Sequence, residues 1–203
     1  MLRSINLLAA MRAPRQPAAL TWRWCCAPGV RAPRALPRGA PFRGVADIAL
    51  LPGWHAQSGP QLDQLVHQCA SATPRLQQVH AAGGLVAGLY NAAALVGEAG
   101  LLAGRRAVAP WPFVASVLRH GADVQLLTDR AWTADQRVWT CDSPVLATEV
   151  MLDMLRHTPL AELAVASAHV YLHSDQRQQV ATRIVAGTHE RILPSGALER
   201  ARH

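Results

Sequence analysis

The chain has 203 residues and a mass of 21.9 kDa, which fits one domain of ordinary size. Half of its residues are hydrophobic and 16% are charged, and this excludes a disordered chain, because disordered chains are rich in charge and poor in apolar residues. No apolar run approaches the ~20 residues that a membrane-spanning helix needs, so no membrane partner is expected.

The net charge of +7 comes from one end of the chain. Residues 1–46 carry eight arginines and no acidic residue, whereas residues 47–203 hold 12 arginines and 13 acidic residues. Such a start is typical of a basic arm that meets nucleic acid or an anionic surface, or of an organellar transit segment. We favour a bias toward arginine, since the chain has no lysine at all and its body is nearly neutral. With no apolar signal core, a cytoplasmic location is expected.

The cysteines and histidines do not follow the spacing of metal ligands. Cys25 and Cys26 are adjacent, Cys69 and Cys141 are isolated, and the nine histidines are scattered. We expect thiols in a reducing compartment, no metal and no cofactor.

The first 45 residues carry local patterns of a helix and a strand. Residues 4–11 place Ile5, Leu8 and Ala9 on one helical face, and Pro14 and Pro17 follow. Residues 20–26 alternate in the manner of a strand, and Pro28-Gly29 predicts a turn.

From residue 46 onward, short apolar runs alternate with helical patterns. Strands are predicted over residues 46–51, 84–89, 106–109 and 124–127, with a hairpin around Ala134-Asp135-Gln136. Helices are predicted over residues 61–69, 74–82, 91–102, 113–120, 144–157, 160–169 and 176–186. This alternation predicts an α/β fold, a three-layer sandwich with a mostly parallel central sheet.

Ligand sites of parallel sheets lie at the carboxyl ends of the strands. Three segments are expected there, at residues 52–55, 89–91 and 139–143. The candidate pocket residues, with Trp111 from a neighbouring segment, are Trp54, His55, Tyr90, Asn91, Trp111 and Cys141. Such a pocket would suit a small apolar or planar effector, but the same aromatic rings could instead plug the space.

The helix predicted from Pro144 has polar residues at its start and on one face. Thr140 and Ser143 are expected to cap it, and Pro144 suits its first turn. Glu149 and Asp153, four residues apart, are expected on a solvated face where they repel each other mildly.

These motifs, taken in order, resemble the ThiJ/PfpI family, a class I glutamine-amidotransferase-like fold. They are most similar to the domain at the N-terminus of AraC-type transcription regulators. The similarity lies in residues 47–53 (DIALLPG), in residues 98–107 (EAGLLAGRRA), in Trp111, and in residues 138–140 (VWT) before a helix with Glu149. It covers residues 46–168 well and residues 4–45 loosely, as the family's first helix and second strand. It implies a flavodoxin-like sheet whose first strand is missing and a domain truncated at both ends.

The sequence departs from this family at the positions that carry its chemistry. Tyr90 stands at the position of the nucleophilic cysteine, and Pro110 stands at the position of its histidine. Trp54 replaces a glycine whose backbone N–H contributes to an oxyanion hole in the family. A phenol with a pKa near ~10 and no adjacent base cannot act as a thiolate does. No catalytic residue is therefore expected, and the chain is predicted not to be an enzyme.

The resemblance predicts three segments and leaves several functions open. A basic segment is expected over residues 1–45, a ThiJ/PfpI-like domain over 46–186 and a tail over 187–203. The favoured function is a non-catalytic sensing or interaction domain that binds a small-molecule effector, forms a homo-oligomer and does not itself bind DNA. The alternative is a small hydrolase or amidase whose nucleophile has moved to Cys141, and a weaker one is a nucleic-acid binder that uses its basic start.

Overall fold

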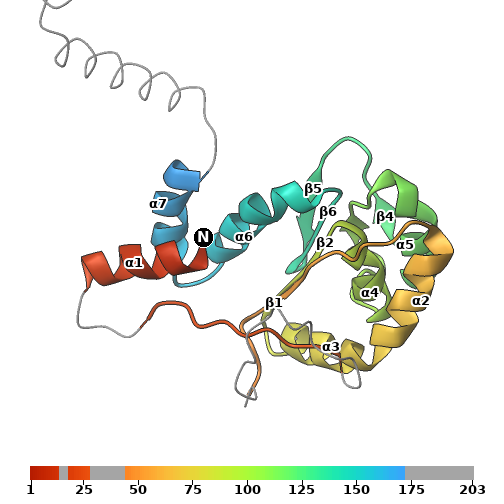
Figure 1. Ribbon diagram of the computed structural model, residues 1–203, viewed down its shortest axis with the longest axis horizontal. Coiled ribbons are helices and arrows are strands. Elements are labelled where there is room, and N and C mark those ends of the chain that lie inside the picture. Colours follow the sequence, from red (N-terminus) through yellow and green to blue (C-terminus); the bar gives the residue numbers. More distant parts are fainter. Residues whose placement is uncertain (14–17, 28–43, 172–203) are drawn as a thin grey trace, which may run out of the picture.

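The computed structural model describes residues 1–13, 18–27 and 44–171 (Figure 1). Its central sheet has the order β1-β2-β6-β5. The strands are β1 (Ile48–Leu51), β2 (Leu85–Leu89), β5 (Trp132–Asp135) and β6 (Val138–Cys141). β1 and β6 each pair with β2 in parallel, while β5 pairs with β6 in antiparallel fashion. The predicted mostly parallel sheet is therefore confirmed.

Two short parallel strands form a separate sheet beside the central one. It consists of β3 (Arg106–Ala107) and β4 (Gln125–Leu126). The backbone N–H of Val108 donates to Thr140 Oγ1 at 2.8 Å, and this bond ties the end of β3 to β6. Thr140 is thus not a helix cap, as its sequence position had suggested, whereas Ser143 Oγ does accept from Val145 N at 3.4 Å.

One face of the sheet is covered by four helices, namely α2 (Gly59–Cys69), α3 (Thr73–Ala81), α4 (Ala93–Glu98) and α5 (Val114–His120) (Figure 1). Ser58 caps α2, and the buried Leu62 and Val66 of α2 join the core. Gly88 allows α4 to approach β2, because a Cβ at this position would lie 2.8 Å from Val96 Cγ2 and 3.0 Å from the backbone nitrogen of Ala93.

α4 is shorter than the predicted helix over residues 91–102. Gly100 has a φ of +71°, and Leu101 N donates to Val96 O at 3.1 Å while Gly100 N donates to Gly97 O at 2.7 Å. These two bonds form a Schellman motif, which satisfies the last carbonyls and ends the helix. The predicted end lies two residues before Gly104, which also has a positive φ of +65°, but Gly100 already supplies the left-handed residue that the motif requires.

The opposite face is covered by α6 (Ala147–Arg156), which follows a 3₁₀ turn over Pro144–Leu146. The indole of Trp132 donates to Glu149 Oε1 at 3.0 Å, and that of Trp139 donates to Asp153 Oδ2 at 2.9 Å. The expectation that Glu149 and Asp153 lie on a solvated, repelling face was wrong. Each carboxylate instead accepts a bond from the hairpin, so this side of α6 is held on the sheet by polar contacts as well as apolar ones.

Two further helices pack beside α6, namely α1 (Leu2–Arg12) and α7 (Ala161–Tyr171). Ile5 of α1 is fully buried in a cluster with Leu152, Leu155 and Ala164. The predicted helix over residues 4–11 is therefore present, with a polar anchor beside it: Asn6 Nδ2 donates to Leu20 O at 2.7 Å, and Leu20 N donates to Asn6 Oδ1 at 2.8 Å.

The chain has no strand over residues 20–26, where the sequence had predicted one. Residues 21–26 are exposed and have no place in either sheet, so the alternation of Trp22 and Trp24 does not reflect a buried face. The predicted turn at Pro28-Gly29, the helix over residues 176–186 and the tail over residues 187–203 lie outside the described residues. The domain boundaries at residues 45 and 186 stay predictions.

The hairpin predicted around residues 134–136 is present, with its turn one position further on. β5 and β6 are joined by Gln136 and Arg137, whose φ angles are +47° and +67°. Two consecutive left-handed residues are the mark of a type I′ turn, whose twist suits antiparallel strands. Among the helices of the described ranges, none combines the length and the apolar character that crossing a membrane requires.

Candidate ligand site at the strand ends

The side chain of Asn91, which follows β2, makes two hydrogen bonds to the backbone of Trp54, which follows β1. These bonds link the carboxyl ends of the two strands. Because the two strands are parallel, with Leu51 opposite Gly88, the segments that follow them leave the sheet at the same edge. The fully buried Asn91 accepts the N–H of Trp54 on its Oδ1 at 2.8 Å and donates its Nδ2 to Trp54 O at 3.0 Å. The backbone of Trp54 is therefore fully engaged by one amide side chain.

Tyr90 occupies a constrained turn between β2 and α4. Its φ of +55° lies in the left-handed region, which residues other than glycine, asparagine and aspartate rarely adopt. The ring stacks edge-on against Phe113 with centroids 5.7 Å apart, and it lies close over Gly53. A Cβ on Gly53 would come within 3.0 Å of Tyr90 Cδ1, so this glycine makes room for the phenol.

Cys141 lies next to this turn but is not exposed. It stands opposite Leu89 in the pairing of β6 with β2, and its side chain is fully buried. Its thiol donates to Ser143 O at 3.3 Å. Burial raises the pKa of the Cys141 thiol and outweighs the opposite effect of the nearby Tyr90 and Ser143 backbone. A nucleophilic thiolate needs the reverse conditions, namely access and a lowered pKa.

The structure brings together three of the six candidate residues, Trp54, Tyr90 and Asn91. Cys141 is buried in β6 opposite Leu89, the residue before Tyr90. His55 is exposed, and Trp111 is 87% exposed, so neither takes part in the packing of the other aromatic residues. Phe113, two residues after Trp111, supplies the ring that meets Tyr90. Sequence reasoning missed Phe113 because the 3₁₀ turn over Trp111–Phe113 decides which of two neighbouring aromatic residues points inward.

The aromatic side chains at the strand ends are part of the packed core. Trp54 and Tyr90 are half-buried and pack against the large core cluster, and the buried Phe113 lies under the phenol. No cluster of three or more His, Cys, Asp or Glu side chains suited to a metal occurs within the ranges that the structure describes. Pro110 is buried directly before Trp111 and has no group that exchanges protons.

Comparison with known proteins places this arrangement in a class of folds. No protein-family model matches the chain, and no curated protein matches it either. A putative transcriptional regulator from Vibrio parahaemolyticus is similar in structure, with a TM-score of 0.54, 16% identity, and coverage of 68% of this chain and 72% of that one. Drosophila melanogaster DJ-1beta has a TM-score of 0.51 and 19% identity over 63% of this chain and 64% of its own.

An AraC family transcriptional regulator from Pseudomonas putida shows 25% identity with a TM-score of 0.43, over 61% of this chain and 62% of that one. The chain thus spans about two thirds of the length of the structures that it matches. The two structures with the higher TM-scores share an α/β fold with this chain, and one of them is a DJ-1 protein. The chain therefore has a fold of the DJ-1 type, in line with the α/β sandwich that the sequence predicts.

Proposed function

We propose that the chain is a non-catalytic sensing or interaction domain, related to the domain that precedes the DNA-binding part of AraC-type regulators. The observation that carries this proposal is the double hydrogen bond between Asn91 and the backbone of Trp54. An oxyanion hole needs free donors aimed at the reacting oxygen. At the position where the family offers such a donor, the N–H of Trp54 is already bound to a side chain.

The nucleophile position supports the same proposal. Tyr90 keeps a strained strand-to-helix turn, but its phenol lies over Gly53 and against Phe113 in place of a thiolate. Pro110 offers no base. What the strand ends present is a set of aromatic side chains next to a buried amide, and such surfaces bind small planar or apolar molecules.

The alternative, a hydrolase or amidase with a relocated nucleophile, would have to use Cys141. Its proximity to the Tyr90 turn is the only feature that favours this role, and its complete burial and raised pKa oppose it. We therefore propose no catalytic residue in this chain. A small-molecule effector, a homo-oligomer, no direct DNA binding and a cytoplasmic location stay predictions that accompany the sensing role.

Two assays on the purified chain test the proposal. Binding of benzoate and indole, as planar probes, is measured by calorimetry for the wild type, for Tyr90→Ala and for the control Trp111→Ala, which removes an exposed ring outside the packed group. We expect saturable binding that Tyr90→Ala weakens at least tenfold and Trp111→Ala leaves within twofold. Equal effects of the two variants would place the binding elsewhere.

Turnover of peptide, amide and glyoxal substrates is measured alongside, with Cys141→Ala as the control. We expect rates at the buffer background for both proteins. Turnover that disappears with Cys141→Ala would overturn the proposal and assign the chemistry to that thiol. The double variant Tyr90→Cys with Pro110→His is the smallest change that restores a thiol and a base together, and the single change Tyr90→Cys is expected to stay inactive.

A further inference from the structure

A charged cluster joins three helices on the face of the sheet that carries the candidate site. His120, near the end of α5, points its Nε2 at Asp63 Oδ1 of α2, 3.2 Å away, and its Nδ1 at Glu98 Oε2 of α4, 2.8 Å away. Its side chain is only 11% exposed, and the two carboxylates are 28% and 33% exposed. Arg119 completes the cluster with a bond of 2.6 Å to Asp63 Oδ2.

The two contacts of His120 can both be hydrogen bonds in only one protonation state of the ring. A neutral imidazole has one N–H, whereas an imidazolium has two. Carboxylate oxygens only accept, so both contacts are hydrogen bonds only when both ring nitrogens carry a proton. In the neutral ring, one lone pair would face a carboxylate at hydrogen-bonding distance, and that contact would become repulsive.

The same three helices begin at the three segments of the candidate site. Trp54 precedes α2, Tyr90 and Asn91 lead into α4, and Phe113 leads into α5. α4 and α5 are short, six and seven residues, so the cluster at their far ends lies about 10 Å along each helix from the site. A change in the packing of these helices would therefore shift the residues that precede them, among them Trp54, Tyr90 and Phe113.

We propose that His120 is a proton-controlled clamp that holds the candidate site closed while it is doubly protonated and loosens the site when it loses a proton. The charged and titratable groups that face it are Asp63 from α2, Glu98 from α4 and Arg119 from its own helix; the 3₁₀ turn over Trp111–Phe113 contributes none. This clamp would regulate the site described under the proposed function. Its biological role therefore rests on that function, whereas the contacts of His120 do not.

The direction of the pH effect follows from which protonation state of His120 makes more hydrogen bonds in the folded protein. The doubly protonated ring makes two bonds that link α5 to α2 and to α4, so this linkage is complete at the lower end of the titration of His120. It is lost as the pH rises through that titration, because only one bond can remain. Ligand access at the strand ends should therefore increase toward alkaline pH.

The first measurement is the ring itself. The ¹⁵N shifts of His120 in the full chain are followed against pH by NMR, with His67, an exposed histidine of α2, as the internal reference. We expect both N–H signals of the doubly protonated His120 ring to be visible and slow to exchange, because each proton is held by a carboxylate, whereas those of the exposed His67 ring exchange too fast to be seen. Fast exchange of either N–H of His120 would overturn the proposal.

The second measurement is the coupling to the site. Amide protection factors of Trp54, corrected for the intrinsic rate of exchange, are measured across the titration of His120 in the wild type, His120→Gln, Glu98→Gln and the control His67→Gln. We expect a five- to tenfold loss of protection on deprotonation in the wild type and in His67→Gln. His120→Gln should show the low protection at every pH, and Glu98→Gln an intermediate value.

A protection factor of Trp54 that does not change while His120 loses its proton would overturn the coupling, even where the variants differ in overall stability. Global unfolding is monitored in the same experiment through amides of β2, which should stay protected throughout. Benzoate binding at one fixed pH reports separately on the proposed function, so a failure of the clamp and a failure of the sensing role give different results.

Discussion

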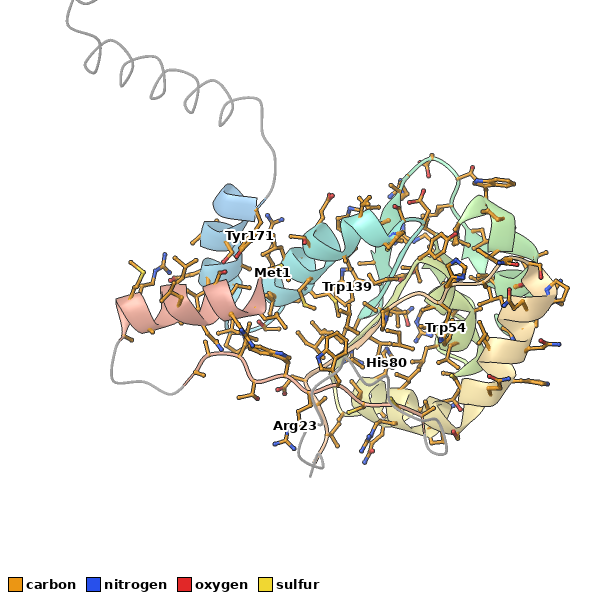
Figure 2. The ribbon with its side chains drawn as sticks, viewed as in Figure 1. Met1, Arg23, Trp54, His80, Trp139 and Tyr171 are labelled. Carbon is orange, nitrogen blue, oxygen red and sulfur yellow. The ribbon has the colours of Figure 1, made fainter. Side chains whose placement is uncertain are left out.

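The two faces of the central sheet are held by polar contacts of different kinds. On the face of α2 to α5, an ionic cluster around His120 joins helix to helix. On the face of α6, the indoles of Trp132 and Trp139 donate from the sheet to Glu149 and Asp153 of the helix. Indole has no proton to exchange near neutral pH, whereas imidazole does. The α6 face also has an imidazole, because His157 Nε2 lies 3.8 Å from Asp153 Oδ2, but the side chain of His157 is 57% exposed whereas that of His120 is 11% exposed. The polar contacts of the α6 face therefore centre on the indoles, of which Trp139 lies between the sheet and α6 (Figure 2).

The largest expected effect comes from breaking the α6 face at its central ring. Trp139 is 2% exposed and belongs to the cluster under α6, so Trp139→Ala removes both a large buried ring and the bond to Asp153. We expect a loss of about 3–5 kcal/mol in the free energy of unfolding, measured in urea. Trp139→Phe keeps most of the volume and should cost clearly less; equal losses would mean that the ring packs less tightly than described.

The next effect tests the candidate site on the other face. Gly53→Ala would place a Cβ 3.0 Å from atoms of both Tyr90 and Asn91. Because the phenol and the amide are each held by other contacts, we expect a loss of about 1–3 kcal/mol in unfolding free energy. Amide exchange should localise the disturbance to the segments after β1 and β2. A variant as stable as the wild type would show that the phenol moves freely off this glycine.

A smaller effect is expected from the acid titration of Asp63. Burial acts to raise the pKa of Asp63, but hydrogen bonds from Arg119, Ser116 and His120 outweigh it, so this pKa lies below its ordinary value. The charged carboxylate therefore stabilises the folded state at pH values above about 4, and this contribution is lost as the pH falls through the lowered pKa.

Asp63→Asn should accordingly lower the stability at pH 6 by about 1 kcal/mol, since the carboxylate is partly exposed to solvent. The difference from the wild type should vanish at low pH, where both side chains are neutral. Denaturant unfolding at a series of pH values measures this, and Asp129→Asn, from an exposed pair with Arg130, is the matched control. A constant difference at all pH values would contradict the assigned ionic role.

The smallest effect should come from the outer indole. Trp132→Phe removes the bond to Glu149 but leaves a ring on a half-buried edge strand, so we expect a loss of about 0.5–1.5 kcal/mol. This loss should be the same at pH 6 and pH 8, unlike that of His120→Gln. A clear pH dependence of the Trp132→Phe effect would remove the distinction between this indole contact and the cluster around His120.

The fold was predictable wherever the local sequence pattern of a segment is enough to indicate its secondary structure. The alternation of apolar runs and helical patterns predicted the parallel sheet, and the turn-forming residues before Val138 predicted the hairpin. The alternation at residues 20–26 misled because a period of two indicates a strand only if a neighbouring strand is available, and none pairs with this segment among the described residues. The length of α4 was overestimated because two glycines could each end the helix.

The site was predictable only to the level of the strand ends. The motif positions pointed to the segments of Trp54 and Tyr90, which do follow β1 and β2. The pairing of Asn91 with the Trp54 backbone depends on a 37-residue separation that no local pattern encodes. The cluster of Asp63, Glu98 and His120 joins three different helices, so each residue alone resembles an ordinary charged surface position. The carboxylates of α6 were misjudged for the same reason, since their partners lie on the hairpin.

The connectivity of the sheet also bears on the order in which it assembles. β5 and β6 are joined by a two-residue turn and are followed at once by α6, whereas β2 meets β6 across about 50 residues and β1 meets β2 across more than 30. Closing a long loop lowers the chain entropy before the new contacts stabilise the pairing. Strands that are close in sequence therefore pair over a smaller free-energy barrier. The hairpin with α6 should therefore be structured in the folding transition state, and the site-bearing strands should dock onto it late.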